Sequence, residues 1–199
     1  MKALQESVSE LGCRVRLIVG VDEESGSRCI KKYLAEEEVP CASFSPDASF
    51  PLINAEKGIM RLSLSKKFAP NDGIALLSMK AGERFNVVPD KAEAVFNGHL
   101  SEEQAETLKS AGASDVVFEG ANTIVKTRGT SAHAMNPEFG VNAAVKLFGA
   151  LKAISWGEDE LQNHIAYLAE ILSSTDGSGI GIQCRDEVSG PLTCNAGIL

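Results

Sequence analysis

An uninterrupted apolar run, Leu-Ile-Val-Gly-Val at residues 17–21, leaves few folds open to the first part of this chain. Strands buried on both faces of a parallel sheet carry continuous apolar runs, whereas half-exposed strands alternate apolar and polar residues. Sequence patterns predict one helix before this run, at residues 4–11, and another after it, at residues 29–38. Residues 1–57 therefore predict a fragment of a parallel-sheet α/β domain that begins in the middle of a βαβ unit.

The pattern changes near residue 58. Residues 59–65 alternate apolar and polar side chains, as a half-exposed antiparallel strand does. A Ser-Glu-Glu-Gln capping box at residues 101–104 predicts the start of a helix that ends at Gly112. Residues 58–199 therefore predict an α+β domain of βαββαβ type, an antiparallel sheet with helices on one face, incomplete at its C-terminal end. Its further strands are expected at residues 74–80, 92–97, 115–119, 123–129 and 192–198, and its further helices at residues 140–154 and 158–173.

The composition excludes several classes of partner. The formal net charge is −8 and no cluster of Lys and Arg is longer than two residues, which argues against nucleic-acid binding. No apolar run approaches the roughly 20 residues that cross a bilayer, and the first residues lack the apolar stretch of a signal peptide. The five cysteines contain no C-x-x-C pair, so neither a disulfide framework nor a thiolate zinc site is expected. A soluble, cytoplasmic protein without nucleic-acid or membrane partners is predicted.

Acidic residues follow the predicted buried strand directly, as Asp22, Glu23 and Glu24. Ligands of open α/β sheets gather at the carboxyl ends of strands. There, one carboxylate can bind a metal ion while its neighbour takes a proton from metal-bound water. Asp47 follows the next extended piece, residues 42–45, and would lie beside the triplet if the two strands were neighbours. Acidic triplets are also common in solvated loops and at helix N-termini, so both interpretations stay open on composition alone.

Four sequence motifs together carry a family resemblance. In their order along the chain they resemble the Xaa-His (carnosinase-like, β-alanine) dipeptidases, which belong to the aminoacylase and glutamate carboxypeptidase superfamily of dinuclear zinc peptidases. The first motif resembles the catalytic core of that group, and the other three resemble parts of its lid domain. The motifs are Gly-Val-Asp-Glu-Glu-Ser-Gly at residues 20–26 with Phe-Ser-Pro-Asp-Ala-Ser-Phe-Pro at residues 44–51, Arg-Phe-Asn-Val-Val-Pro-Asp at residues 84–90, Gly-Thr-Ser-Ala-His-Ala-Met-Asn-Pro-Glu at residues 129–138, and Pro-Leu-Thr-Cys-Asn-Ala-Gly-Ile at residues 191–198.

This resemblance implies a role for five residues of a zinc-dependent dipeptidase. Glu23 would be the general base that acts on the water between two zinc ions. Glu24 would be a ligand of one zinc ion and Asp47 a ligand of the other. His133 would lean from the lid to stabilise the oxyanion of the tetrahedral intermediate, and Asn86 would hold the substrate at its carboxylate end. Without the surrounding motifs, His133 reads as a surface histidine and Asn86 as a turn residue.

The sequence also departs from the family pattern. An upstream His-x-Asp motif, a C-terminal zinc-binding histidine and a lid arginine that binds substrate have no counterpart here. Only two of the five expected metal ligands are present, whereas a catalytic zinc ion usually has three protein ligands and an open position. The resemblance therefore implies an internal segment of a longer enzyme, with a dipeptide or short peptide as substrate and the missing remainder of the catalytic domain as partner.

Two other functions remain to be weighed. The chain could be a truncated, non-catalytic lid or interaction module that lacks a complete metal site, and the isolated chain is expected to be inactive in either case. A nucleotide-binding domain is disfavoured because the Gly-x-Gly-x-Gly pattern at residues 177–181 lacks the strand–turn–helix setting of a phosphate loop. His99 and His164 belong to no motif and are assigned no function.

Overall fold

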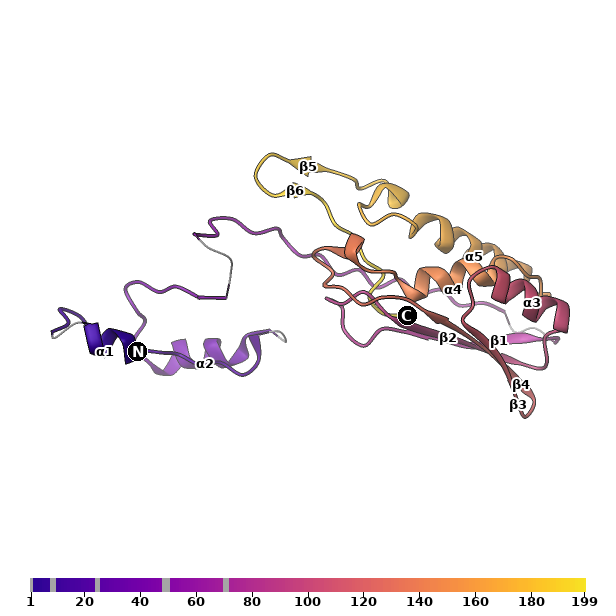
Figure 1. Cartoon of the computed structure of the whole chain (residues 1–199), viewed down its shortest axis with the longest axis horizontal. Helices are drawn as coiled ribbons and strands as arrows, with labels where there is room; N and C mark the ends of the chain where they lie inside the picture. Colours follow the sequence, from indigo (N-terminus) through magenta and orange to yellow (C-terminus); the bar gives the residue numbers. More distant parts are fainter. Residues whose placement is uncertain (1, 8–9, 24–25, 48–50, 70–71) are drawn as a thin grey trace. The chain divides into compact units, whose positions relative to one another are not determined.

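The computed structural model describes residues 2–7, 10–23, 26–47, 51–69 and 72–199 (Figure 1). The chain divides into two compact units, Met1–Ile53 and Asn54–Leu199. None of the helices in the described ranges is long and apolar enough to span a membrane.

The first unit contains two helices, α1 (Lys2–Ser7) and α2 (Arg28–Glu36). Residues 14–20 are extended but form no strand within the described part of this unit, and Val19 and Val21 are 78% and 92% exposed. A strand exists only where a neighbouring strand accepts and donates its backbone hydrogen bonds, and this unit supplies none to the described segment. The structure therefore does not show the parallel sheet that the apolar run predicts.

The second unit is built on a four-stranded antiparallel sheet with the strand order β1-β2-β4-β3. One helix connects β2 to β3, and two more follow β4 along the chain. This arrangement confirms the predicted mixture of an antiparallel sheet with helices. The elements are β1 (Ala75–Ala81), β2 (Lys91–Asn97), α3 (Glu102–Ser110), β3 (Asp115–Glu119), β4 (Asn122–Arg128), α4 (Ala143–Leu151) and α5 (Asp159–Ile171).

The core of the second unit lies on one face of the sheet. Directly opposed residues of β2 and β4 are buried there, for example Ala94 with Val125 and Phe96 with Thr123. Helix α4 packs on this face, and its N-terminal end is tied to β4 by a hydrogen bond from Thr127 Oγ1 to the Ala143 carbonyl at 2.7 Å. Alternate residues of the same strands point to the other face and stay partly exposed. The predicted strands at residues 92–97 and 123–129 are thus confirmed, and their burial alternates with a period of two.

The predicted capping box of α3 is confirmed. The backbone N–H of Gln104 donates to the Ser101 hydroxyl at 3.1 Å, and the backbone N–H of Ser101 donates to the Gln104 side chain at 2.7 Å. Both bonds satisfy groups that a helix N-terminus otherwise leaves without a partner inside the helix. This helix is therefore started by its own local sequence.

Two predicted strands of the second unit are absent from the described residues, and the predicted order of helices and strands along the chain is wrong. At residues 59–65, neighbouring positions such as Met60 and Ile59 are both largely exposed, so the alternation selects no buried face. Residues 192–198 run without strand pairing, although Leu199 and Ala81 exchange two backbone hydrogen bonds, at 2.9 and 3.3 Å. The main elements therefore follow the order ββαββαα rather than βαββαβ. The structure adds a short hairpin, β5 (Arg185–Asp186) with β6 (Gly190–Pro191), and two 3-10 turns, η2 (Pro137–Phe139) and η3 (Ser178–Ile180).

Candidate active-site segments

The acidic turn of the first unit is held by Asp22 against the first turn of α2. One carboxylate oxygen of Asp22 accepts the backbone N–H of Cys29 at 3.0 Å, and the other accepts the backbone N–H and the side-chain Nε of Arg28, both at 3.0 Å. The backbone N–H of Ser27 donates to the Asp22 carbonyl at 2.9 Å. Asp22 thus caps a helix that begins six residues later.

These contacts also set the charge state of Asp22. Hydrogen bonds from Cys29, and after them those from Arg28, hold the pKa of the Asp22 carboxyl well below its usual range. Donors that point at a carboxylate favour its ionised form. Asp22 is therefore anionic throughout the neutral pH range, although its side chain is only 13% exposed.

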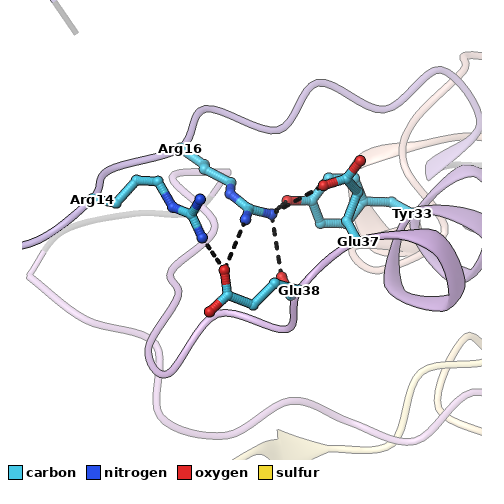
Figure 2. A network of polar contacts seen from close by, with 5 residues as sticks. All are labelled: Arg14, Arg16, Tyr33, Glu37 and Glu38. Carbon is cyan, nitrogen blue, oxygen red and sulfur yellow. Dashed lines mark hydrogen bonds and ion pairs between the residues drawn. The ribbon is translucent and has the colours of Figure 1, made fainter.

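The opposite end of α2 is held to the extended segment by the polar network of Figure 2. Arg16 donates to the Tyr33 hydroxyl at 2.5 Å and to the Glu38 carbonyl at 3.2 Å. Arg14 and Arg16 both pair with the Glu38 carboxylate, and Arg16 also lies 3.7 Å from the Glu37 carboxylate. Since Asp22 binds the other end of the helix, α2 is held by the residues that precede it at both of its ends.

The predicted metal-binding and base residues, Glu23, Glu24 and Asp47, belong to the chain segment of this first unit. Glu23 follows Asp22 in the turn and is exposed, and Asp47 is also exposed. Glu24 lies outside the described residues. Within the described ranges, no three His, Cys, Asp or Glu side chains gather as ligands for a metal ion. The predicted convergence of Glu23, Glu24 and Asp47 stays a prediction, and the described donors alone do not fit a zinc ion.

The second unit places Asn86 and His133 beside the same backbone bridge. Val87 and His133 form an isolated antiparallel bridge. The flanking hydrogen bonds run from the Ala134 N–H to the Asn86 carbonyl at 2.9 Å and from the Val88 N–H to the Ala132 carbonyl at 2.9 Å. Two of the lid-like motifs are thus joined through their backbones, and both predicted residues lie at the junction.

The His133 ring has one nitrogen engaged in its own loop. Its Nδ1 atom accepts the backbone N–H of Met135 at 3.1 Å. A neutral imidazole that accepts at Nδ1 carries its proton on Nε2, so this contact selects the tautomer with an N–H donor at the ring's outer edge. The His133 side chain is exposed, which leaves this edge accessible to a ligand.

Two asparagines that the sequence analysis did not single out tie the fourth motif to this junction. Asn142 Oδ1 caps α4 by accepting the backbone N–H groups of Ala144 and Val145, at 2.9 and 3.3 Å. Its Nδ2 donates to Asn195 Oδ1 at 3.0 Å and to the Ala196 carbonyl at 2.9 Å. Asn195 Nδ2 in turn donates to the Val87 carbonyl at 3.2 Å. An asparagine before an Ala-Ala pair is a typical helix N-cap, and this signal could have identified Asn142 from sequence.

A cavity of about 200 Å³ lies beside this pair of asparagines. Its wall includes Val88, Asn142, Lys146, Thr175 and Cys194. Burial raises the pKa of the Cys194 thiol, so this cysteine stays protonated at neutral pH. The cavity is therefore a mixed apolar and polar hollow without an ionised sulfur nucleophile.

Comparison with known proteins gives two groups of relatives. No family model matches the chain. The chain is 38% identical, over 208 aligned positions, to the Bacillus subtilis (strain 168) protein named "Putative dipeptidase YtjP", and the alignment covers all of this chain and 45% of that protein. It is 29% identical, over 212 positions, to proteins named "Putative dipeptidase" in Staphylococcus aureus strains USA300 and NCTC 8325, again with full coverage of this chain and 45% of each relative. The chain thus resembles, over its whole length, just under half of proteins that are named as dipeptidases.

Proposed function

We propose that this chain is a segment of a zinc-dependent dipeptidase, supplying the general base, part of the metal site and most of the lid. The observation that carries this proposal is its full-length alignment, at 38% identity, with a protein named as a dipeptidase. The local geometry supports it, since Asp22, next to Glu23, is hydrogen-bonded to the start of α2 and His133 presents an N–H donor beside Asn86. The chain spans only 45% of that relative, so the activity belongs to the complete protein.

In this proposal each named residue has one task. Glu23, exposed on the anchored turn, accepts the proton of the attacking water. The Nε2–H of His133 donates to the oxygen that becomes negatively charged as the peptide carbonyl is attacked. Asn86, across the backbone bridge from His133, holds the substrate at its carboxylate end.

Glu24 and Asp47 are proposed as zinc ligands in the complete protein only. The described donors do not form a metal site, so no step of the reaction is assigned to a metal ion. We also propose that residues 17–21 join a parallel sheet when the rest of the catalytic domain is present. Their exposed valines are consistent with this, because an apolar extended segment gains stability when neighbouring strands cover it. The carnosinase-like specificity and the cytoplasmic location belong to the same proposal.

A non-catalytic lid or interaction module is the second candidate. It is favoured by one observation, that the unit Asn54–Leu199 has a hydrophobic core of its own while no three-ligand metal cluster is found among the described residues. This candidate predicts that the chain adds nothing to hydrolysis in any context.

A replacement experiment separates the two candidates. The aligned segment of the Bacillus subtilis relative is exchanged for this chain, and folding of the product is checked by thermal unfolding. The product and the unmodified relative are then assayed for hydrolysis of β-alanyl-histidine and alanyl-alanine with added zinc. The proposal expects turnover, and preference for β-alanyl-histidine would support the carnosinase-like subtype. A folded product without turnover, beside an active relative, would favour the lid module.

Single substitutions in the same product test the assigned residues. Glu23→Gln removes the base and should lower kcat by about 10²–10⁴-fold. His133→Ala removes one oxyanion donor and should lower kcat by about 10²–10³-fold. His99→Ala is the matched control, because His99 is exposed and its contacts with the Gly120 carbonyl at 2.8 Å and the Phe118 ring lie at the β3–β4 hairpin rather than at the Val87–His133 bridge. Equal activity of the His133 and His99 variants would remove His133 from the mechanism.

A further inference from the structure

Helix α2, which follows the proposed base Glu23 along the chain, has an unusual N-terminal cap. The residue directly before a helix usually caps it, and Ser27 occupies that place before α2. In the described part of the turn, however, the Ser27 hydroxyl makes no capping hydrogen bond, and Ser27 adopts the left-handed region with φ +51°. The carboxylate of Asp22 accepts the backbone N–H groups of Arg28 and Cys29 instead. The cap is therefore supplied from the far side of the turn.

We propose that Asp22 is a positioning residue, which holds the adjacent Glu23 in place by accepting hydrogen bonds from the first backbone N–H groups of α2. This inference rests on the proposed function, in which Glu23 is the base. Asp22 is the residue directly before Glu23, so its anchoring sets where the Glu23 backbone begins. The turn is also closed by its own backbone, through the Ser27 N–H to the Asp22 carbonyl at 2.9 Å and the Gly26 N–H to the Glu23 carbonyl at 3.4 Å.

The backbone contacts of Asp22, rather than its ion pair with Arg28, carry this role. The Arg28 side chain is 80% exposed, and an ion pair with so exposed a partner contributes little. The Asp22 side chain is only 13% exposed, and each of its two oxygens accepts one backbone N–H. An asparagine has a single acceptor oxygen, so it can replace only one of these two bonds. The anchoring of Glu23 should therefore be strongest with aspartate at position 22, weaker with asparagine and weakest with alanine.

The first arm of the test measures the anchor itself in the whole chain. Asp22→Ala removes the acceptors of the Arg28 and Cys29 N–H groups, so both amides should exchange faster with solvent, as measured by NMR. Asp22→Asn keeps one acceptor oxygen and should cause a smaller increase. Ser27→Ala and Arg28→Ala are the matched controls, and neither should alter exchange at Cys29. Unchanged exchange in Asp22→Ala would overturn the anchor. Faster exchange throughout the unit Met1–Ile53 would also overturn the proposal, since Asp22 would then serve folding alone.

The second arm measures positioning in the replacement product described above. Misplacement of a catalytic group by about 1 Å can cost about 10²-fold in rate, so Asp22→Ala should lower kcat by about that factor. KM should change less than about twofold, because Asn86 and His133, and not Asp22, are the residues proposed to contact the substrate. Asp22→Asn should recover part of kcat, and the two control variants should match the unsubstituted product.

The outcomes of the two arms are distinguishable. An active product in which Asp22→Ala leaves kcat unchanged overturns the positioning role while the proposed function stands. A product in which KM rises and kcat does not fall overturns it as well, because the substitution then acts on substrate binding. A folded but inactive product refutes the proposed function, and the positioning role falls with it even if the exchange arm shows the anchor.

Discussion

Replacing Asn142 with alanine should destabilise the second unit by about 2–3 kcal/mol. The Asn142 side chain caps α4 and also donates two hydrogen bonds, to Asn195 and to the Ala196 carbonyl. Loss of an N-cap costs about 1 kcal/mol. Each donated bond contributes about 0.5–1 kcal/mol, toward the lower end of the usual range because the site is only partly buried.

Two variants separate the cap from the tether. Asn142→Ser keeps a good N-cap acceptor but loses both donors, so it should cost only the tether, about 1–2 kcal/mol. Asn195→Ala removes one partner of the tether and should combine with Asn142→Ala less than additively, because the two substitutions remove a shared contact.

Urea unfolding followed by tryptophan fluorescence is a suitable assay. The chain has a single tryptophan, Trp156, which is buried in the core of the second unit and so reports on that unit. The slope of the transition should stay constant while the midpoint falls. A loss below about 0.5 kcal/mol in Asn142→Ala, the size of an ordinary surface substitution, would refute the reasoning. Equal losses for serine and alanine would show that the cap contributes nothing.

Three further predictions concern a close backbone approach, a titrating carboxylate and the isolated chain. A Cβ atom on Gly129 would lie 1.9 Å from the Val141 carbonyl oxygen, so Gly129→Ala should lower the free energy of unfolding by about 1–3 kcal/mol in the same urea assay. Gly149 lies on α4 with open space around it, so Gly149→Ala should raise the free energy of unfolding by about 0.5–1 kcal/mol. Hydrogen bonds from Ser178, and after it from Ser174 and Gln183, lower the pKa of the Asp176 carboxyl. The stability that ionised Asp176 contributes is therefore complete above the usual pKa of 3.8 and is lost as pH falls through the lowered pKa. The urea midpoints of the parent chain and Asp176→Asn should therefore differ at pH 7 and converge in acid, and a constant difference would contradict this. The isolated chain should hydrolyse dipeptides no faster than buffer even with added zinc, and robust turnover that a chelator abolishes would contradict this.

Local sequence by itself determined much of the second unit. The Ser101–Gln104 capping box starts α3 because both partners of each hydrogen bond lie within four residues of each other. The strands predicted at residues 92–97 and 123–129 form as β2 and β4, and their burial alternates because successive side chains of a strand point to opposite faces. Helices α4 and α5 lie within their predicted ranges.

Tertiary structure decided the features that depend on a distant partner. Residues 17–21, 59–65 and 192–198 have strand-like patterns, but a strand also requires a neighbouring strand, and none of these segments is paired as a strand in the described residues. Near the C-terminus, the backbone N–H groups of Leu192, Cys194 and Leu199 donate to the carbonyls of Cys184, Thr175 and Ala81, so these bonds go to three separate places and do not form a continuous ladder.

The candidate site divides in the same way. The motifs predict roles for Glu23, Asn86 and His133 from residue type and order, which are properties of the sequence. The proposed role of Asp22 depends on a left-handed Ser27 whose hydroxyl makes no capping hydrogen bond, so the first N–H groups of α2 donate to the Asp22 carboxylate instead. The His133 tautomer likewise depends on the bend that points the Met135 N–H at its ring. A sequence lists the donors and acceptors of a chain, but only the path of the folded backbone decides which of them meet.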